Sequence, residues 1–133
     1  MLLSKLFSTI VITLLIVANC AITFAMNPET VSVQVGKSKI ESSTKIKVEF
    51  VEMMEDSRCP ADVNCIWAGN AKIKIVVSKN GNEKTIELNS GIANKDNCFA
   101  GYNFKLEKLT PEPRSDIRID KNGYVATISM TKI

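Results

Sequence analysis

The cysteines are the residues of this chain whose type and spacing are best suited to chemistry. Cys59 and Cys65 lie within residues 56–70, here called the signature segment, which also contains Trp67, the only tryptophan. Because the chain begins with a sequence typical of an export signal, these two cysteines are expected to meet an oxidising compartment and to form a disulfide. Closing that loop stabilises a fold by about 2.4 kcal/mol in the chain-entropy model.

Cys98 is the remaining cysteine of the mature chain, and three interpretations stay open for it. It is buried as a small apolar residue, it pairs with Cys59 or Cys65 and ties a long loop to the signature segment, or it is a free thiol at the surface. The sequence alone does not separate these connectivities.

Redox catalysis is one alternative use of the paired cysteines. Thioredoxin-like motifs keep two residues between their cysteines at a helix N-terminus, which helps to hold a thiolate. Here five residues intervene, in a loop with no helix after it. Arg58 lies beside Cys59, but pairing with Asp56 or Glu55 accounts better for its charge. The spacing therefore disfavours a redox enzyme.

Metal binding is a second alternative. Met53 and Met54, together with the signature cysteines, are soft ligands of the kind that suits Cu(I), although packing in a core explains the methionines as well. Asp56, Asp62 and Asn64 offer oxygen ligands, yet their spacing matches no known calcium loop. We therefore expect no metal and no cofactor.

Histidine is absent from the whole chain. This excludes a Ser-His-Asp triad, a Cys-His pair and a histidine zinc site built within the chain. A carboxylate-based enzyme would need groups such as Glu55 and Asp56 to face a cleft beside Asp96, and nothing in the sequence indicates that cleft. We expect a protein that is not an enzyme.

The N-terminus predicts export. Lys5 precedes an apolar run over residues 6–18, which has the length of a signal-peptide core and is short for a membrane span. Cleavage after Ala25 leaves 133 − 25 = 108 residues, enough for one domain at residues 26–133. In the alternative interpretation, a lipobox ends at Cys20 and the product is an envelope lipoprotein, although Asn19 fits that pattern poorly.

The charge balance argues against a nucleic-acid partner. Without residues 1–25, whose only charge is Lys5, the chain has 16 basic and 14 acidic residues. The lysines alternate along predicted strands instead of forming a patch. Membrane contact is expected only through a lipid on Cys20.

Alternation of apolar and polar residues with period two predicts an all-β fold. The first strand is expected around residues 31–35 and the second around residues 45–54, with Met54 on the core face beside Phe50. A third strand is expected over residues 65–77, with a bulge or bend near Gly69-Asn70. Trp67 is expected to face the core, and anchoring a ligand is the alternative role for it.

Turn residues divide the remainder. Asn80-Gly81 predicts a tight hairpin, and residues 89–101 predict a long polar loop. A strand around residues 102–107 stops at the prolines of residues 110–113. A short strand at 117–119 is expected to lead through Asn122-Gly123, a second hairpin signal, into a final strand at 124–130. About seven strands favour a small antiparallel β-sandwich, Ig-like, or a partly open barrel.

The signature segment resembles the core of a family of small exported bacterial proteins and lipoproteins. The resemblance is carried by Asp-Ser-Arg-Cys-Pro at residues 56–60 and Cys-Ile-Trp-Ala-Gly-Asn-Ala at residues 65–71. Residues 101–102, 109–113 and 124–126 are similar as well, so it covers most of the mature chain. It implies a compact β-sandwich outside the cytoplasm, and it transfers no activity and no catalytic residue.

Together these observations favour an exported, periplasmic or secreted binding module that recognises a protein or an envelope component through loops on a rigid scaffold. An inhibitor of a secreted hydrolase is one version, and a structural envelope protein is another. The loops expected to bind are residues 56–64 and 89–101. The candidate binding residues are Asp56, Arg58, Asp62, Asn64, Trp67, Asn94 and Asp96.

Overall fold

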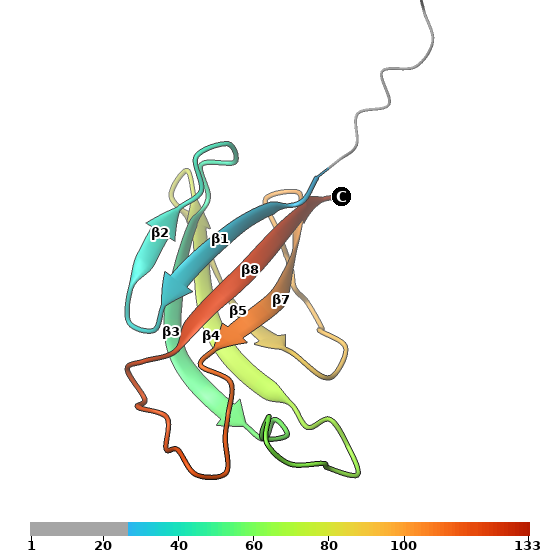
Figure 1. Cartoon of the computed structure of the whole chain (residues 1–133). Coiled ribbons are helices and arrows are strands. Elements are labelled where there is room, and N and C mark those ends of the chain that lie inside the picture. The colour runs from blue at the N-terminus through green and yellow to red at the C-terminus, as the bar shows by residue number, and fades with distance from the viewer. Residues whose placement is uncertain (1–26) are drawn as a thin grey trace, which may run out of the picture.

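The structure is a computed structural model that describes residues 27–133, so the expected leader, its cleavage site and Cys20 lie outside the described residues. The described part is all-β, with eight strands (Figure 1). They are β1 (Glu29–Gln34), β2 (Ser38–Ile40), β3 (Lys47–Asp56), β4 (Ala71–Lys79), β5 (Asn82–Asn89), β6 (Cys98–Phe99), β7 (Tyr102–Thr110) and β8 (Val125–Lys132). No helix within residues 27–133 is long and apolar enough to cross a membrane.

The strands form two antiparallel sheets of four strands each. Their orders are β1-β8-β7-β6 and β2-β3-β4-β5. The sheets meet where β1 contacts β2 and β3 and where β5 contacts β7. This arrangement confirms the predicted β-sandwich, and the two sheets do not close into a barrel (Figure 1).

The core lies between the sheets and follows the predicted alternation closely. Val31 and Val33 of β1 point inward, as do Val48 and Phe50 of β3. A strand with period-two alternation buries one face only, which is why the intervening polar residues stay exposed. The largest fully buried side chains are Phe50, Phe104, Ile46, Ile73, Ile75, Ile86, Leu88, Ile128, Met130, Val48 and Val77.

The hairpin predicted at Asn80-Gly81 joins β4 to β5. Lys79 pairs with Asn82 across the turn, and both turn residues have positive φ, 53° at Asn80 and 79° at Gly81. A two-residue turn of this kind matches the right-handed twist of the strands. The hairpin prediction is therefore confirmed, and the turn lies at the upper end of the sandwich in Figure 1.

The third strand starts later than predicted, at Ala71. Residues 57–70 instead form an irregular loop at the lower end of Figure 1. The loop folds back on itself, because the Ser57 amide donates to the Asn70 carbonyl at 2.8 Å and the Cys59 amide to the Ala68 carbonyl at 3.2 Å. The prediction that Trp67 faces the core is wrong, since its exposed fraction is 73%.

Three smaller predictions are also corrected. A bulge in β3 shifts the register between Phe50 and Glu52, so Met53 packs on the core and Met54 is exposed. Residues 117–119 form no strand, only an isolated bridge between Arg114 and Ile117. The Asn122-Gly123 pair therefore joins no hairpin and belongs to an irregular turn before β8.

Candidate binding site in the signature segment

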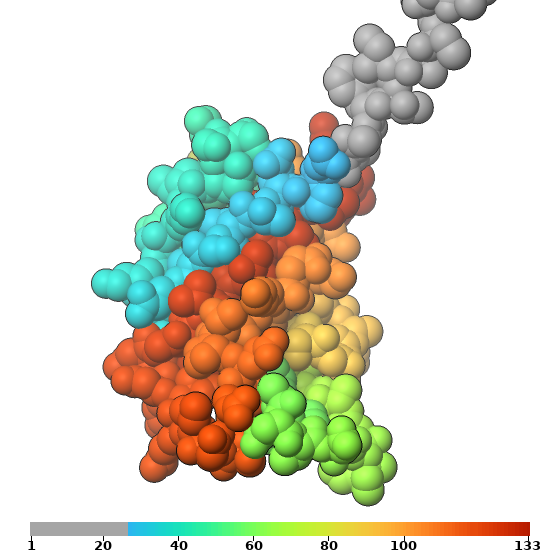
Figure 2. All heavy atoms as spheres, viewed as in Figure 1, coloured from blue at the N-terminus to red at the C-terminus, as the bar shows by residue number. Residues whose placement is uncertain are grey.

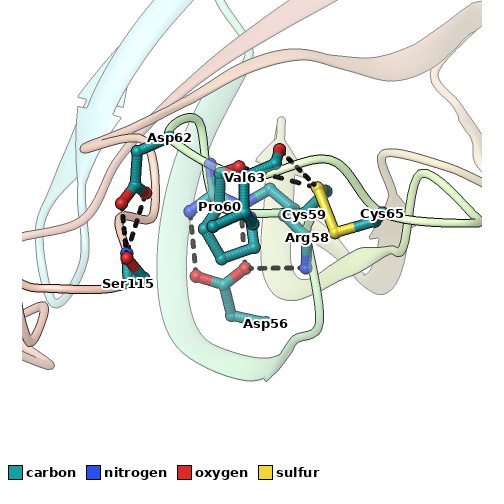
Figure 3. Close-up of a disulfide and its surroundings, with 8 residues drawn as sticks. All are labelled: Asp56, Arg58, Cys59, Pro60, Asp62, Val63, Cys65 and Ser115. Atoms are coloured by element: carbon teal, nitrogen blue, oxygen red, sulfur yellow. Dashed lines mark hydrogen bonds and ion pairs between the residues drawn. A yellow bond between two sulfur atoms is a disulfide. The ribbon is translucent and has the colours of Figure 1, made fainter.

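The disulfide closes the signature segment as predicted. Cys59 and Cys65 are bonded, with their Cα atoms 5.9 Å apart (Figure 3). The backbone hydrogen bonds of Ser57 and Cys59 join the two arms of the loop just outside this bridge. Covalent and hydrogen-bonded closure together hold the eight residues 61–68, all exposed, as a projecting loop.

Arg58 clamps the base of this loop to both sheets. Its Nε and Nη2 donate to the two carboxylate oxygens of Asp56, at 2.7 and 2.9 Å. Its Nη1 donates to the Leu109 carbonyl at 2.7 Å and its Nη2 to the Pro111 carbonyl at 3.0 Å. Tyr124 completes the cluster by donating from its hydroxyl to Asp56 at 2.9 Å. The predicted pairing of Arg58 with Asp56 is confirmed, and the guanidinium also links β3 to the end of β7.

The electrostatics of the clamp favour the charged carboxylate. Burial raises the pKa of Asp56, but hydrogen bonds from Arg58 and Tyr124 and the charge of Arg58 outweigh it, so the net pKa lies below its ordinary value. Burial and the bond to Asp56 raise the pKa of Tyr124. The cluster thus holds an ion pair and a neutral phenol, and no proton in it is poised for transfer near neutral pH.

Gly69 and Asn70 have structural roles as well. Gly69 has φ 73°, and a Cβ there would overlap the Ser57 carbonyl oxygen, so only glycine fits. The Asn70 side chain donates to Asn89 at 3.0 Å and accepts from the Gly91 amide at 2.9 Å. These contacts fix the signature segment against the beginning of the loop that follows β5.

Asp62 joins the signature segment to the loop between β7 and β8. Its carboxylate accepts from the amide of Ser115 at 2.9 Å and from the Ser115 hydroxyl (Figure 3). These bonds lower the pKa of Asp62. The Ala61 amide donates to the Pro113 carbonyl at 2.8 Å. Figure 2 shows the two segments, green and orange-red, side by side at the lower end of the molecule.

Asn64, Ile66 and Trp67 are exposed residues of the signature segment that take no part in this network, and of the three only Ile66 and Trp67 are apolar. Ile66 is 95% exposed and Trp67 is 73% exposed, and Val63 nearby is 44% exposed. Each lies on the projecting loop, and neither Ile66 nor Trp67 belongs to the core or packs against it. The loop therefore presents an apolar pair to its surroundings at the tip of a rigid support.

A groove of about 470 Å³ lies at the base of the signature segment. One wall is formed by Arg58, Cys59 and Ala68, and the other by Leu106 to Leu109 of β7. Leu106 and Leu109 are themselves buried, at 5% exposure each. Ile66 and Trp67 do not line this groove, so the apolar tip and the groove are separate features at one end of the sandwich.

The other predicted site residues separate into two groups. Asn94 accepts from the Asn89 amide at 2.6 Å, and Asn89 contacts Asn70, so this half of the loop adjoins the signature segment. Asp96 pairs instead with Lys84 at 2.7 Å, away from Glu55 and Asp56. Cys98 is exposed and free, so its burial and its pairing with Cys59 or Cys65 are both excluded.

Sequence reasoning missed the partners of the clamp and the role of Ile66. The carbonyls of Leu109 and Pro111 carry no side-chain signal, whereas Ile66 could have been found as an apolar residue inside a run of turn residues. Among residues 27–133, no three His, Cys, Asp or Glu side chains gather in a geometry that could hold a metal ion.

No family model, curated protein or solved structure matches this chain. The class is therefore defined by fold and site: a small two-sheet β-sandwich that carries a disulfide-closed loop with an apolar tip at one end.

Proposed function

We propose that this protein is an exported binding module that recognises a protein partner through Ile66 and Trp67 at the tip of the signature segment. The observation that carries the proposal is the exposure of this pair, 95% and 73%, on a loop held by a disulfide and by the Arg58 clamp. Tryptophan is enriched among the residues that dominate binding energy at protein interfaces.

Rigidity supports the same function. Binding costs about 0.5–1.5 kcal/mol for each flexible side chain that becomes ordered, and more when a loop must be ordered too. The signature segment is already ordered in the free protein, through the Cys59–Cys65 bridge and the hydrogen bonds of Arg58. A partner would bury Ile66 and Trp67 without ordering the loop.

The stability of a tip variant separates binding from a structural role. The double variant Ile66→Ser and Trp67→Ser should change the free energy of unfolding by less than about 0.5 kcal/mol, as surface substitutions do. Urea unfolding followed by circular dichroism measures this. A loss above about 2 kcal/mol would show that the pair is packed, and the proposal would fail.

Site-specific crosslinking tests recognition itself. A photoreactive residue is placed at position 67, and in a control chain at Thr85 on the outer face of β5, and both are expressed in an exporting host. The proposal expects one discrete protein adduct from position 67 and none from position 85, with loss of the adduct when Ile66 is changed to Ser. Identical adducts from both positions, or none from position 67, would overturn it.

Inhibition of a secreted hydrolase is the version of this function that the loop shape favours. All of residues 61–68 are exposed and the loop is closed at its base, so it is convex and suited to a concave cleft. Purified protein should then slow a secreted hydrolase identified through the adduct, and the Ile66→Ser and Trp67→Ser variant should not.

Export and anchoring are tested by the intact mass of protein from an exporting host. A mass beginning at Met26 supports a free exported module, whereas acyl chains on Cys20 support an envelope lipoprotein. A full-length mass starting at Met1 would contradict export. The disulfide is compatible with an oxidising compartment.

A further inference from the structure

One edge of β7 is covered by β6 over only part of its length. β7 has nine residues, and β6 pairs with Tyr102 and Asn103 alone. The next residue on this edge, Phe104, exchanges two bonds with Asn97: its amide donates to the Asn97 carbonyl at 2.9 Å, and its carbonyl accepts from the Asn97 side chain at 2.7 Å. Asp96, with φ 52°, breaks the extended chain before Asn97. Within residues 27–133, no strand pairs with this edge beyond Phe104.

The main chain of Leu106 points to this uncovered edge. In an antiparallel ladder, the N–H and C=O groups of successive residues point alternately to the two sides of the strand. Phe104 faces away from β8, as its bonds to Asn97 show. Leu106 lies two residues later and before the bulge of β7, so its N–H and C=O face the same way.

This donor and acceptor of Leu106 are nearly buried but have no protein partner. Leu106 is 5% exposed, and on the side away from β8 no residue in the range 27–133 forms a hydrogen bond with its N–H or C=O. Buried main-chain groups are almost always paired. The pair is therefore suited to bind a ligand that offers one acceptor and one donor.

The groove at the base of the signature segment follows the same edge. It is lined by four consecutive residues of β7, Leu106 to Leu109. Neighbouring side chains of a strand point to opposite faces, so four in a row can line one groove only if the groove runs along the edge. At its far end, the Leu109 carbonyl already accepts from Arg58 at 2.7 Å. The edge between Phe104 and Leu109 is about 16 Å long, enough for about four residues of extended chain.

The rest of the lining favours an uncharged main chain as the ligand. The opposite wall consists largely of small residues, which leave space beside β7: Ala61, Ala68, Gly69 and Gly91. The charged residues of the lining are Arg58 and Lys108 against Glu107 and Glu112, so their formal charges cancel. An extended peptide carries one N–H donor and one C=O acceptor on each residue, which complements the N–H and C=O of Leu106.

We infer that this groove binds a short extended segment of a partner protein, which adds to β7 as a further strand. One residue of the segment accepts from the Leu106 N–H and donates to the Leu106 C=O, as in other cases of strand addition to a sheet edge. Ile66 and Trp67 do not line this groove. The inference therefore goes beyond the proposed recognition by the tip and does not depend on it.

Selection from a phage-displayed library of random heptapeptides supplies the probe. The target is the full protein purified from an exporting host, and each recovered peptide is tested again on the Ile66→Ser and Trp67→Ser variant. Peptides in the groove should bind this variant as tightly as the wild-type protein, because the tip does not line the groove. If no recovered peptide binds the tip variant, the inference about the groove fails, whereas recognition through Trp67 still stands.

Methylation of the peptide nitrogens tests recognition of the main chain. Nitrogens that face β7 alternate with nitrogens that face away, so single N-methylation along the peptide should weaken binding at alternate positions. The loss at each sensitive position should be about fivefold, the usual net worth of one hydrogen bond. In NMR spectra, the Leu106 amide should shift on binding and exchange more slowly with solvent, whereas the Phe104 amide, already bonded to Asn97, should change little. Equal effects at every nitrogen, or an unchanged Leu106 signal, would overturn the inference.

A variant that fills the groove gives an independent test. Ala61 and Ala93 are both exposed alanines, and only Ala61 lines the groove. Ala61→Phe should lower peptide affinity about tenfold through overpacking, and the matched control Ala93→Phe should change it little. Equal affinities of the two variants would contradict binding in the groove. A Leu106 signal that shifts with protein concentration in the absence of peptide would also contradict it, since a second copy of the chain would then be the occupant.

Discussion

Arg58 gives the sharpest test of how the signature segment is built. Changing it to alanine removes both bonds to Asp56 and both bonds to the carbonyls of Leu109 and Pro111. The side chains of Arg58 and Asp56 are each only 14% exposed. The substitution therefore leaves a mostly buried carboxylate that keeps one strong partner, the hydroxyl of Tyr124.

The size of the effect follows from that arrangement. Breaking a fully buried pair by removing one partner costs about 3–5 kcal/mol, because the remaining charge is uncompensated. Partial exposure and the Tyr124 bond reduce the cost, so we expect Arg58→Ala to lower the free energy of unfolding by about 3 kcal/mol. The pKa of Asp56 is lower in the folded protein than its ordinary value of 3.8. The stability that the ion pair gives the wild-type protein is therefore lost as the pH falls below 3.8 and Asp56 becomes protonated. The difference in unfolding free energy between the wild-type protein and Arg58→Ala should accordingly shrink below pH 4.

The assay is urea unfolding followed by far-ultraviolet circular dichroism, because exposed Trp67 reports poorly on the core. Hydrogen exchange of residues 57–70 should accelerate while the strands stay protected. Arg114→Ala is the control: its pair with Asp116 is exposed, at 48% and 64%, and should contribute less than about 0.5 kcal/mol.

Two outcomes would refute the reasoning about the clamp. A loss no larger than that of Arg114→Ala would mean that the bonds of Arg58 are replaced by water at no cost. Complete unfolding of the sheets would mean that Arg58 supports the whole fold and not the signature segment.

Two further predictions concern backbone and turn positions. Glu41→Gln should cost about 2 kcal/mol at pH 7, because bonds from the Ser43 and Thr44 amides lower the Glu41 pKa from 4.5 to about 2. This stability is present above pH 4.5 and is lost as the pH falls towards 2. Chemical unfolding across this range should therefore show the unfolding free energies of the wild-type protein and Glu41→Gln converging. A difference between them that stays constant with pH would contradict the prediction. Gly69→Ala should lower the free energy of unfolding by about 2 kcal/mol, because the new Cβ overlaps the backbone of Ser57. Urea unfolding measures this against the control Gly81→Ala, a position with positive φ but open space around the Cβ. Equal losses of stability in the two variants would show that the overlap at Gly69 is relieved.

The strands were predictable because their faces are set by local alternation. Val31, Val48 and Phe104 lie where period two puts them, since one face of each strand meets the other sheet. The alternation pattern predicted the wrong start for β4. Cys65, Trp67 and Gly69 continue the spacing of its buried residues, but the strand begins only at Ala71. The disulfide and the hydrogen bonds between Ser57 and Asn70 end the strand there.

The candidate site was predictable only in part, because its decisive contacts join distant positions. The pairing of Arg58 with Asp56 is local and was expected, whereas the bond to the Leu109 carbonyl spans 51 residues. The fate of Cys98 was equally open, since its place in β6 depends on pairing with the start of β7. Bulges, as in β3, change which side chain is buried without any sign in composition.

Most residues of the signature segment have a structural role, whereas its exposed apolar pair has none. Asp56, Arg58, Gly69 and Asn70 are explained by the fold, as are the two bonded cysteines. An isoleucine at 95% exposure contributes nothing to the core, and an exposed apolar pair favours association whenever a complementary surface is present. The Cys59–Cys65 disulfide and the four hydrogen bonds of the Arg58 guanidinium fix the base of the loop that carries this pair. Fixing an exposed apolar pair in this way supports the proposal that Ile66 and Trp67 contact a partner.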